Sequence, residues 1–179
     1  MSRAQRKDRQ ALGALYERYF DRVYRYVLSR LGNVAEAEDL TEEVFVTMLH
    51  SISSFRWQGA SFGAWLMRVA HNKLIDHFRR KGRLLEQTTE EMPEVVGPDD
   101  PAKEVEARFT AEFLSGAIRK LTPAQREVVA MRFAAGLSVA ETAQSLGKSE
   151  NNVKVLQFKG IQGLRRMMQN DPSAPSGRL

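Results

Sequence analysis

The chain has 179 residues, of which 42% are hydrophobic and none is cysteine, and its formal net charge is +5. This length allows one domain or two small ones, and the hydrophobic content is enough for a buried core. The absence of cysteine excludes a disulfide-stapled fold, a cysteine-ligated metal site and a thiol nucleophile. No stretch approaches the roughly 20 apolar residues of a membrane span. No apolar signal core follows the charged N-terminus, so we expect a cytoplasmic protein.

The charge is divided unevenly along the chain. Residues 1–83 hold 15 basic and 9 acidic side chains, residues 84–106 hold 1 and 8, and residues 107–179 hold 11 and 5. The acidic stretch has no sustained apolar period and carries three of the six prolines. This predicts an extended acidic linker over 84–109. The alternative to a functional role for its charge is a simple solvated spacer. We expect two basic domains, over 8–83 and 110–170, and a flexible tail over 171–179.

The first basic segment has the apolar period of helices. Apolar residues recur every three or four positions from Leu12 to Val27, and Gly32 ends that helix. Asn33 with Glu36 has the form of an N-cap and its reciprocal acid, and it opens a second helix. We expect that helix to bury the stripe formed by Ala37, Leu40, Val44, Met48 and Ile52.

A polar loop over 53–60 leads to a third helix, which Ser61 can cap and which reaches about Lys81. Its expected buried arc consists of Gly63, Leu66, Met67, Ala70, Leu74 and Phe78. The opposite face is polar and basic, with Trp65, Arg68, Asn72, Asp76 and Arg79, flanked by Lys73 and Arg80. Trp65 and the aromatic side chains of the nearby loop could stack on unpaired bases and hold them. The alternative for Trp65 is a place at the edge of the core.

The second basic segment contains several helix-capping residues. Thr122, Pro123 and Gln125 open one helix, which runs through Phe133 to Gly136, and Ser138 with Glu141 opens a short one. Gly147 ends the short helix and Ser149 caps a long one that reaches about Gln169. A short helix, a glycine turn and a longer helix are typical of a helix-turn-helix.

The last helix has two distinct faces. Its expected buried stripe is Val153, Leu156, Gly160, Leu164 and Met167. The opposite arc is basic and also contains amide and apolar groups: Asn151, Lys154, Val155, Phe158, Lys159, Gln162, Arg165 and Arg166. An ordinary solvated helix face is the alternative, but the helix-turn-helix context favours a surface that enters the DNA major groove.

The second helix carries acidic residues near its N-terminus: Glu38, Asp39, Glu42 and Glu43. The helix dipole favours acid there, which could be the whole reason for their position. Because an acidic ridge would repel phosphate, a basic protein partner is the functional interpretation.

Three stretches together resemble the extracytoplasmic-function (ECF) sigma factors, the minimal members of the sigma-70 family. They are AEDLTEEVF (37–45), FGAWLMRVAHNKLIDHFRRKGR (62–83) and LTPAQREVVAMRFAAGLSVAETAQSLGKSENNVKVLQFKGIQGLRR (121–166). The resemblance implies an all-α chain with region 2 over 8–83 and the helix-turn-helix of region 4 over 110–170. It also implies a subunit that directs core RNA polymerase to promoters, contacting its β′ clamp and β flap, and that is held by an anti-sigma factor.

The resemblance also implies site residues. The core-polymerase surface would consist of Asp39, Leu40, Glu42, Glu43 and Phe45, although the family usually has glutamine where this chain has Glu42. The −10 element would be bound by Phe55, Trp57, Trp65, Arg68, His71, Asn72, Arg79 and Arg80. The −35 element would be read by Asn151, Asn152, Lys154, Val155, Phe158 and Lys159. The acidic linker would thread the polymerase channels and compete there with RNA.

Two other classes of function are alternatives. A stand-alone helix-turn-helix regulator explains the last domain equally well, but it leaves the aromatic loop, the acidic helix and the linker without a role. An enzyme is not indicated, because the three histidines lack metal-ligand spacing and no phosphate-cradling glycine loop occurs. We therefore expect no catalysis by the chain itself, no metal and no cofactor.

Overall fold

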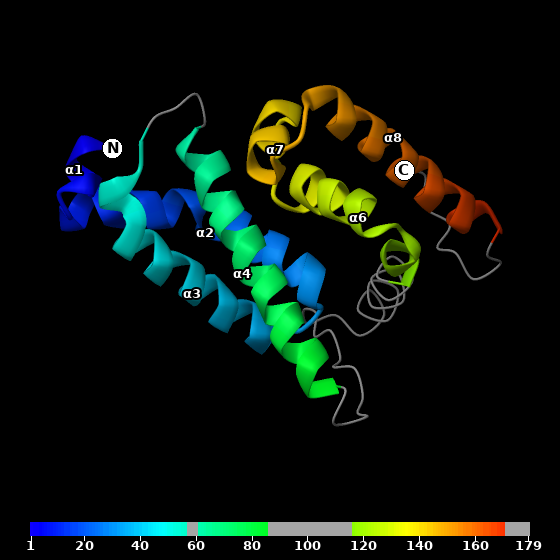
Figure 1. Ribbon diagram of the computed structural model, residues 1–179, viewed down its shortest axis with the longest axis horizontal. Coiled ribbons are helices and arrows are strands. Elements are labelled where there is room, and N and C mark those ends of the chain that lie inside the picture. Colours follow the sequence, from blue (N-terminus) through cyan, green and yellow to red (C-terminus); the bar gives the residue numbers. More distant parts are fainter. Residues whose placement is uncertain (57–60, 86–115, 171–179) are drawn as a thin grey trace, which may run out of the picture.

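The computed structural model describes residues 1–56, 61–85 and 116–170, and these are mostly helical, with no strand in the described ranges (Figure 1). The all-α prediction is therefore confirmed. The predicted tail over 171–179 lies outside the described residues. So does the predicted linker over 84–109, apart from residues 84 and 85, which end a helix.

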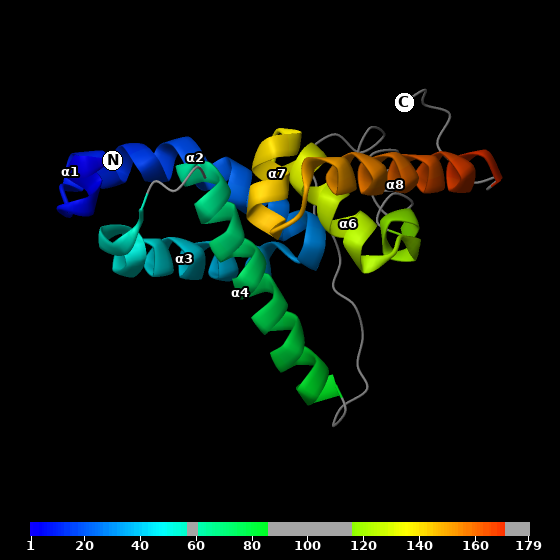
Figure 2. The same cartoon turned by 45° about the horizontal axis from the view of Figure 1, so that its top comes forward.

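The first domain is built from α1 (Ser2–Gln5), α2 (Arg9–Leu31), α3 (Val34–Ser51), the 3₁₀ turn η1 (Ile52–Ser54) and α4 (Phe62–Leu85). α2 and α3 form a helical hairpin, and α4 crosses them (Figure 2). Gly32 joins the hairpin with φ 72°, a left-handed conformation that glycine adopts without strain.

The caps of the first domain follow the sequence, with one difference. Asn33 accepts a 2.9 Å hydrogen bond from the Glu36 amide, and the Ser61 hydroxyl accepts one of 3.1 Å from the Ala64 amide. The reciprocal half of the Asn33 cap was predicted wrongly. The Glu36 carboxylate accepts a hydrogen bond from Lys81 on α4 at 2.8 Å, because an ammonium group is a stronger partner than a backbone amide.

The predicted apolar faces form the core of the first domain. The whole α3 stripe from Ala37 to Ile52 is buried, and so is the α4 arc up to Leu74. The assignment of Phe78 to the buried arc was wrong, because this side chain is exposed. It lies near the C-terminal end of α4, where the Arg30 guanidinium lies 5.7 Å from the centroid of its ring and the His77 ring meets it edge-on at 6.0 Å.

The second domain contains a helical stretch over 116–120, followed by α6 (Pro123–Val129), the π-helical turn η2 (Ala130–Ala134), α7 (Val139–Leu146) and α8 (Glu150–Asn170). Both predicted capping boxes are present, at Thr122 and at Ser138. The predicted helix through Phe133 widens into the π-helical turn of η2. α8 packs against α6 and α7, and Gly160 permits the approach because an added Cβ would lie 2.9 Å from Val129 Cγ2.

The two domains lie directly against each other in the closed arrangement seen in Figures 1 and 2. α7 packs against α4, and η2 packs against α2. The apolar side chains of Met131 and Leu137 join the same buried cluster as the core of the first domain. The sequence predicted two domains but contained no signal for this contact.

Candidate functional site

α8 presents the predicted outer arc to solvent. Every residue of that arc is exposed, and Asn152 beside it is exposed as well. The Ser149 hydroxyl accepts a 3.2 Å hydrogen bond from the Asn152 amide, which fixes the start of α8 directly after the α7 turn. In the middle of the face Phe158 is 64% exposed among cationic neighbours. A large aromatic side chain left in water is unusual on a helix that also has a buried face, and it marks a contact surface.

The chemistry of this face suits duplex DNA. Lysine and arginine side chains neutralise phosphates or donate to guanine acceptors, and apolar side chains can contact a thymine methyl group. The face belongs to the second helix of a helix-turn-helix, whose N-terminal half enters the major groove in proteins of this architecture. Gln157 is not part of it, because its amide oxygen accepts a 2.8 Å hydrogen bond from Arg132 inside the domain.

The polar face of α4 is only partly open. Asn72, Arg79 and Arg80 are exposed. Arg68 is engaged by the second domain, because its guanidinium donates to the backbone carbonyls of Gln144 and Ser145 on α7. α7 thus contacts the predicted DNA-binding face at Arg68, which nevertheless stays exposed, as do Asn72, Arg79 and Arg80.

The aromatic residues near the start of α4 pack mainly on one another. The Phe55, Phe62 and Trp65 rings have centroids between 5.2 and 5.7 Å apart. Phe55 is only 6% exposed and packs in the core in this structure, and its predicted contact with an unpaired base stays a prediction. Trp65 is half-buried at the edge of this cluster, and Trp57 lies outside the described residues. The sequence could not separate these roles, because aromatic residues suit a core and a stacking surface equally.

The acidic helix α3 divides the predicted polymerase surface into two groups. Asp39, Glu42 and Glu43 are exposed. Leu40 and Phe45 are 2% and 4% exposed and belong to the core, so in this structure they support the surface from beneath, and their predicted contact with polymerase stays a prediction. Leu40 was already part of the predicted apolar stripe, which was the signal against assigning it to a surface.

Two apolar residues of α3 were missed. Val46 and Leu49 are exposed large side chains, and with the three acids they extend one continuous side of the helix. The available signal was their position off the buried stripe: Val46 lies three and four residues after Glu43 and Glu42, and Leu49 lies three residues after Val46. α3 therefore offers a surface that is acidic at one end and apolar at the other.

Ion pairs tie α3 to α4. Glu43 accepts from Lys73 at 3.2 Å, and Glu36 lies 3.1 Å from His77 and 2.8 Å from Lys81. Partial burial would raise the pKa of Glu36, but the hydrogen bonds and charges of Lys81 and His77 outweigh it and hold this pKa below its ordinary value.

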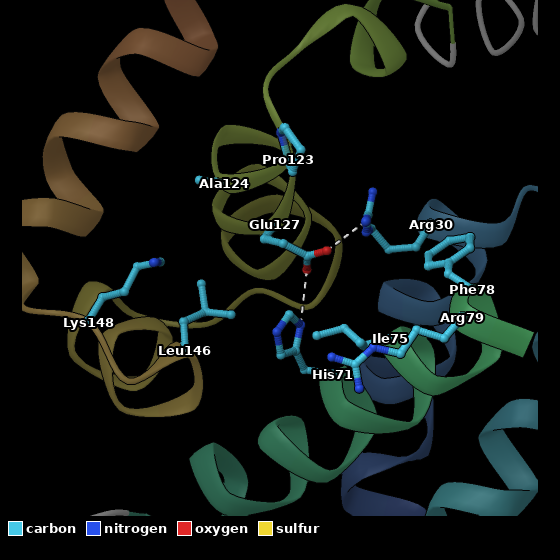
Figure 3. A pocket seen from close by; sticks show the side chains of 10 residues that line it. All are labelled: Arg30, His71, Ile75, Phe78, Arg79, Pro123, Ala124, Glu127, Leu146 and Lys148. Atoms are coloured by element: carbon cyan, nitrogen blue, oxygen red, sulfur yellow. Dashed lines mark hydrogen bonds and ion pairs between the residues drawn. The ribbon is translucent and has the colours of Figure 1, made fainter. Parts of the chain in front are cut away.

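A second charged cluster lies between the domains, around Glu127 of α6 (Figure 3). One carboxylate oxygen accepts from Arg30 at 2.6 Å; the other accepts from the Tyr26 hydroxyl at 2.8 Å and lies 3.2 Å from His71 Nδ1. Burial would raise the pKa of Glu127, but its three partners hold it below its ordinary value. Burial and the Glu127 charge raise the pKa of Tyr26, so its hydroxyl stays protonated and donates. No pattern in the sequence indicates this cluster.

Beside Glu127 a pocket of about 500 Å³ opens along the seam between α4 and the second domain. Ile75, Phe78, Pro123 and Leu146 form its apolar walls, and Arg79 and Lys148 also line it (Figure 3). Across the described ranges, no group of three or more His, Asp or Glu side chains is arranged to hold a metal ion. No helix in those ranges combines the length and apolar character that crossing a membrane requires.

The chain is similar to two known family models and to characterised proteins. The family model for Sigma-70 region 2 matches residues 15–84, and the model for Sigma-70, region 4 matches residues 117–166. The ECF RNA polymerase sigma factor BldN of Streptomyces coelicolor is 42% identical over 172 residues, which cover 96% of this chain and 65% of BldN. The ECF sigma factor SigX of Bacillus subtilis is 29% identical over 163 residues, covering 87% of this chain and 82% of SigX.

Solved structures share the fold. CnrH in complex with the cytosolic domain of CnrY superposes with a TM-score of 0.71 at 23% identity, covering 95% of each chain. RpoE of Bartonella quintana, in complex with the anti-sigma factor NepR, superposes with a TM-score of 0.74 at 18% identity, covering 90% of this chain and 99% of RpoE. Two sigma-70 regions in succession, together with the relationship to BldN and SigX, show that the chain belongs to the ECF group of the sigma-70 family.

Proposed function

We propose that this chain is an RNA polymerase sigma factor. It binds core polymerase in the cytoplasm, recognises the −35 and −10 promoter elements, assists promoter melting and initiates transcription of a stress or developmental regulon. The observation that carries the proposal is the exposed outer face of α8, which combines cations with an exposed Phe158 in a helix-turn-helix. The chain is a specificity subunit, so the chemistry of RNA synthesis belongs to the polymerase.

The second domain reads the −35 element. The outer face of α8 enters the major groove, where lysines contact phosphates or guanines and the apolar side chains contact thymine methyl groups. The residues in this role are Asn151, Asn152, Lys154, Val155, Phe158 and Lys159, all of which are exposed. The same domain docks on the β flap of the polymerase.

The first domain binds the −10 element through the polar face of α4. Asn72 and Arg68 contact an unpaired base near the start of the helix, together with Trp65 and His71. Arg79 and Arg80 grip phosphates further along. Trp57 belongs to the same group by its place in the sequence, and Phe55 supports the site from the core.

The exposed side of α3 binds the β′ clamp of core polymerase. Asp39, Glu42 and Glu43 supply charges that orient a basic partner, while Val46 and Leu49 supply the apolar area that excludes water. A surface that mixes charged and apolar residues in this way is typical of a non-obligate protein interface, which forms and dissociates.

An anti-sigma factor is the further partner that we propose. The support is that the structural relative RpoE of Bartonella quintana is bound to the anti-sigma factor NepR, and that CnrH is bound to the cytosolic domain of CnrY. Such a partner would cover the polymerase and DNA surfaces of this chain until it is released.

Transcription from a promoter library with purified chain and core polymerase tests the proposal. We expect promoter-dependent transcripts that share −35 and −10 sequences. Lys154→Ala should reduce transcription from promoters that depend on the −35 element, and Asn72→Ala should impair open complexes more than closed ones. No association with core polymerase, combined with tight binding of an isolated duplex site, would instead support a stand-alone regulator.

A further inference from the structure

The N-terminal helix α1 packs on η1, the turn that leads from α3 toward α4. Ala4 of α1 is 1% exposed and belongs to the same buried cluster as Phe55. Beside it, the side-chain amide of Gln5 donates a 2.7 Å hydrogen bond to the backbone carbonyl of Phe55, which lies 50 positions further along the chain. α1 lies at the end of the first domain away from α6 and α8 (Figures 1 and 2). This contact therefore belongs to the first domain alone.

The turn between α1 and α2 fixes the place of α1. Lys7 has φ 61°, a left-handed conformation that is unfavourable for a residue with a Cβ. Asp8 closes the turn, because its carboxylate accepts from the Ala11 amide at 2.9 Å and pairs with Arg3 at 3.0 Å. The Asp8 amide also donates to the Arg3 carbonyl at 3.1 Å. A strained turn persists only where the surrounding contacts over-determine it, so α1 is held in one position beside η1.

Phe55 connects this N-terminal segment to the start of α4. The centroid of its ring lies 5.2 Å from that of Trp65 and 5.7 Å from that of Phe62. In a close-packed cluster a shift of the Phe55 backbone would shift its ring and the rings that touch it. Trp65 is half-buried at the edge of the cluster, on the face of α4 that the proposed function assigns to the −10 element. The position of Phe55 therefore influences the position of Trp65.

We propose that Gln5 is a positioning residue for promoter melting: through the Phe55 carbonyl it holds the aromatic cluster where Trp65 can stack on an unpaired base of the −10 element. The inference rests on the proposed function, in which the residues before α2 have no role. The Phe55 carbonyl lies just past the end of η1, where a carbonyl has no partner within the helix, and Gln5 supplies the donor. Because stacking depends on the place of the ring, losing this bond weakens the hold on unpaired bases.

The fluorescence of Trp65 measures the positioning directly in the free chain. The chain has two tryptophans, so Trp57→Phe leaves Trp65 as the single emitter. In that background Gln5→Met removes the donor with little change in side-chain size. We expect acrylamide to quench Trp65 more strongly, because the rings around it are less tightly held. Gln10→Met makes the same change at an exposed position, where the amide bonds Arg3 instead of Phe55, and should leave the quenching unchanged.

Binding of promoter DNA by the holoenzyme tests whether the positioning serves melting. The probe is a fork-junction DNA made from a promoter recovered from the library, duplex over the −35 element and single-stranded over the −10 element. Gln5→Met, assembled with core polymerase, should bind this probe about fivefold more weakly, the factor that corresponds to a hydrogen bond of typical net strength. Its affinities for core polymerase and for duplex −35 DNA should not change, whereas a general loss of folding would lower all three affinities.

A charged variant separates the lost donor from a change in packing. Gln5→Glu keeps the size of the side chain but places a carboxylate against the Phe55 carbonyl, which repels it. The loss of fork-junction binding should therefore exceed that of Gln5→Met. Ser2→Asp adds the same charge at an exposed position of α1 and should bind the probe like the parent chain. Equal binding by Gln5→Glu and the parent chain would mean that the bond to Phe55 does not hold the cluster.

Other results would also contradict a positioning role. Unchanged quenching of Trp65 in Gln5→Met would show that Gln5 does not position the cluster. Stronger quenching with unchanged fork-junction binding would show that the position of Trp65 does not matter to the promoter. If the parent holoenzyme binds no promoter probe, the proposed function fails and the promoter role of Gln5 fails with it, whereas the quenching still reports the contact between Gln5 and Phe55.

Discussion

At the scale of single residues, exposure separates side chains that bind from side chains that hold the fold. Phe158 and Phe133 belong to the same domain and are 64% and 59% exposed, but only Phe158 lies on the outer face of α8. Leu40 and Val46 belong to the same helix, yet one is core and the other surface. These two pairs allow binding and stability to be measured separately.

Phe158→Ala should weaken binding of duplex −35 DNA while changing the free energy of unfolding by less than about 0.5 kcal/mol, because little buried area is lost. Gel-shift titration and urea unfolding measure the two quantities. Phe133→Ala is the matched control and should leave DNA binding unchanged. Equal losses of DNA affinity in both variants would remove Phe158 from the reading surface.

Leu40→Ala should lower the free energy of unfolding by about 2 to 5 kcal/mol, because it leaves a cavity in the core of the first domain. Val46→Ser should leave stability nearly unchanged and weaken association with core polymerase. Chemical unfolding and a polymerase pull-down compare the two variants. A stable Leu40→Ala chain with lost polymerase binding would return Leu40 to the contact surface.

At the scale of elements, local sequence set the helix boundaries. Both predicted capping boxes are present because a hydroxyl three residues before an amide can satisfy it without help from the rest of the fold. Glu36 departs from its predicted role because two cations of α4, absent from any local window, attract its carboxylate. η2 departs as well, and it is the element that packs against α2 of the other domain.

Ser138→Ala removes the acceptor that holds the Glu141 amide at the start of α7. We expect a loss of about 1 kcal/mol in the stability of the second domain, since a capping bond of this type has that typical value. Thermal unfolding followed by circular dichroism measures it. Ser138→Asp keeps an acceptor at the same place and should retain most of the stability; an equal loss there would mean that the cap is not the cause.

At the scale of the whole molecule, closure depends on the charge of Glu127. Its pKa is below the ordinary value in the closed form, so the contact is stabilised at pH values above the ordinary glutamate pKa. That stabilisation is lost as the pH falls through the lowered value, because the protonated carboxyl no longer attracts Arg30. Acid should therefore loosen the domain contact.

The chain has no cysteine of its own, so Ser61→Cys with Gln144→Cys places two thiols across the domain contact. The yield with which a short bis-methanethiosulfonate linker joins them, measured against pH with the reaction time adjusted so that thiol reactivity is equal, checks this dependence. The yield should decrease toward acid pH. Glu127→Gln in the same background should give a lower yield with a weaker acid dependence, because its amide carries no charge at any pH. A decrease that is identical in both chains would assign the acid effect to other groups.

The sequence by itself determined the all-α class, the helix starts at Asn33, Ser61, Thr122, Ser138 and Ser149, and the basic outer arc of α8. These follow from periodicity and capping, which act within a few residues of the chain. The sequence predicted only in part which residues of α3 are buried and which are exposed. Acidic and apolar residues are interspersed there, and the helix packs against both α2 and α4.

Only the tertiary structure decided that Phe55 is buried, that Arg68 is engaged by α7, and that Glu127 joins Tyr26, Arg30 and His71. Tyr26 and Arg30 lie 101 and 97 positions from Glu127 in the sequence, and no local pattern records such a partner. The physical reason is that a buried charge is specified by whichever groups surround it in space. The sequence alone therefore defined two basic helical domains, and their packing defined a closed molecule.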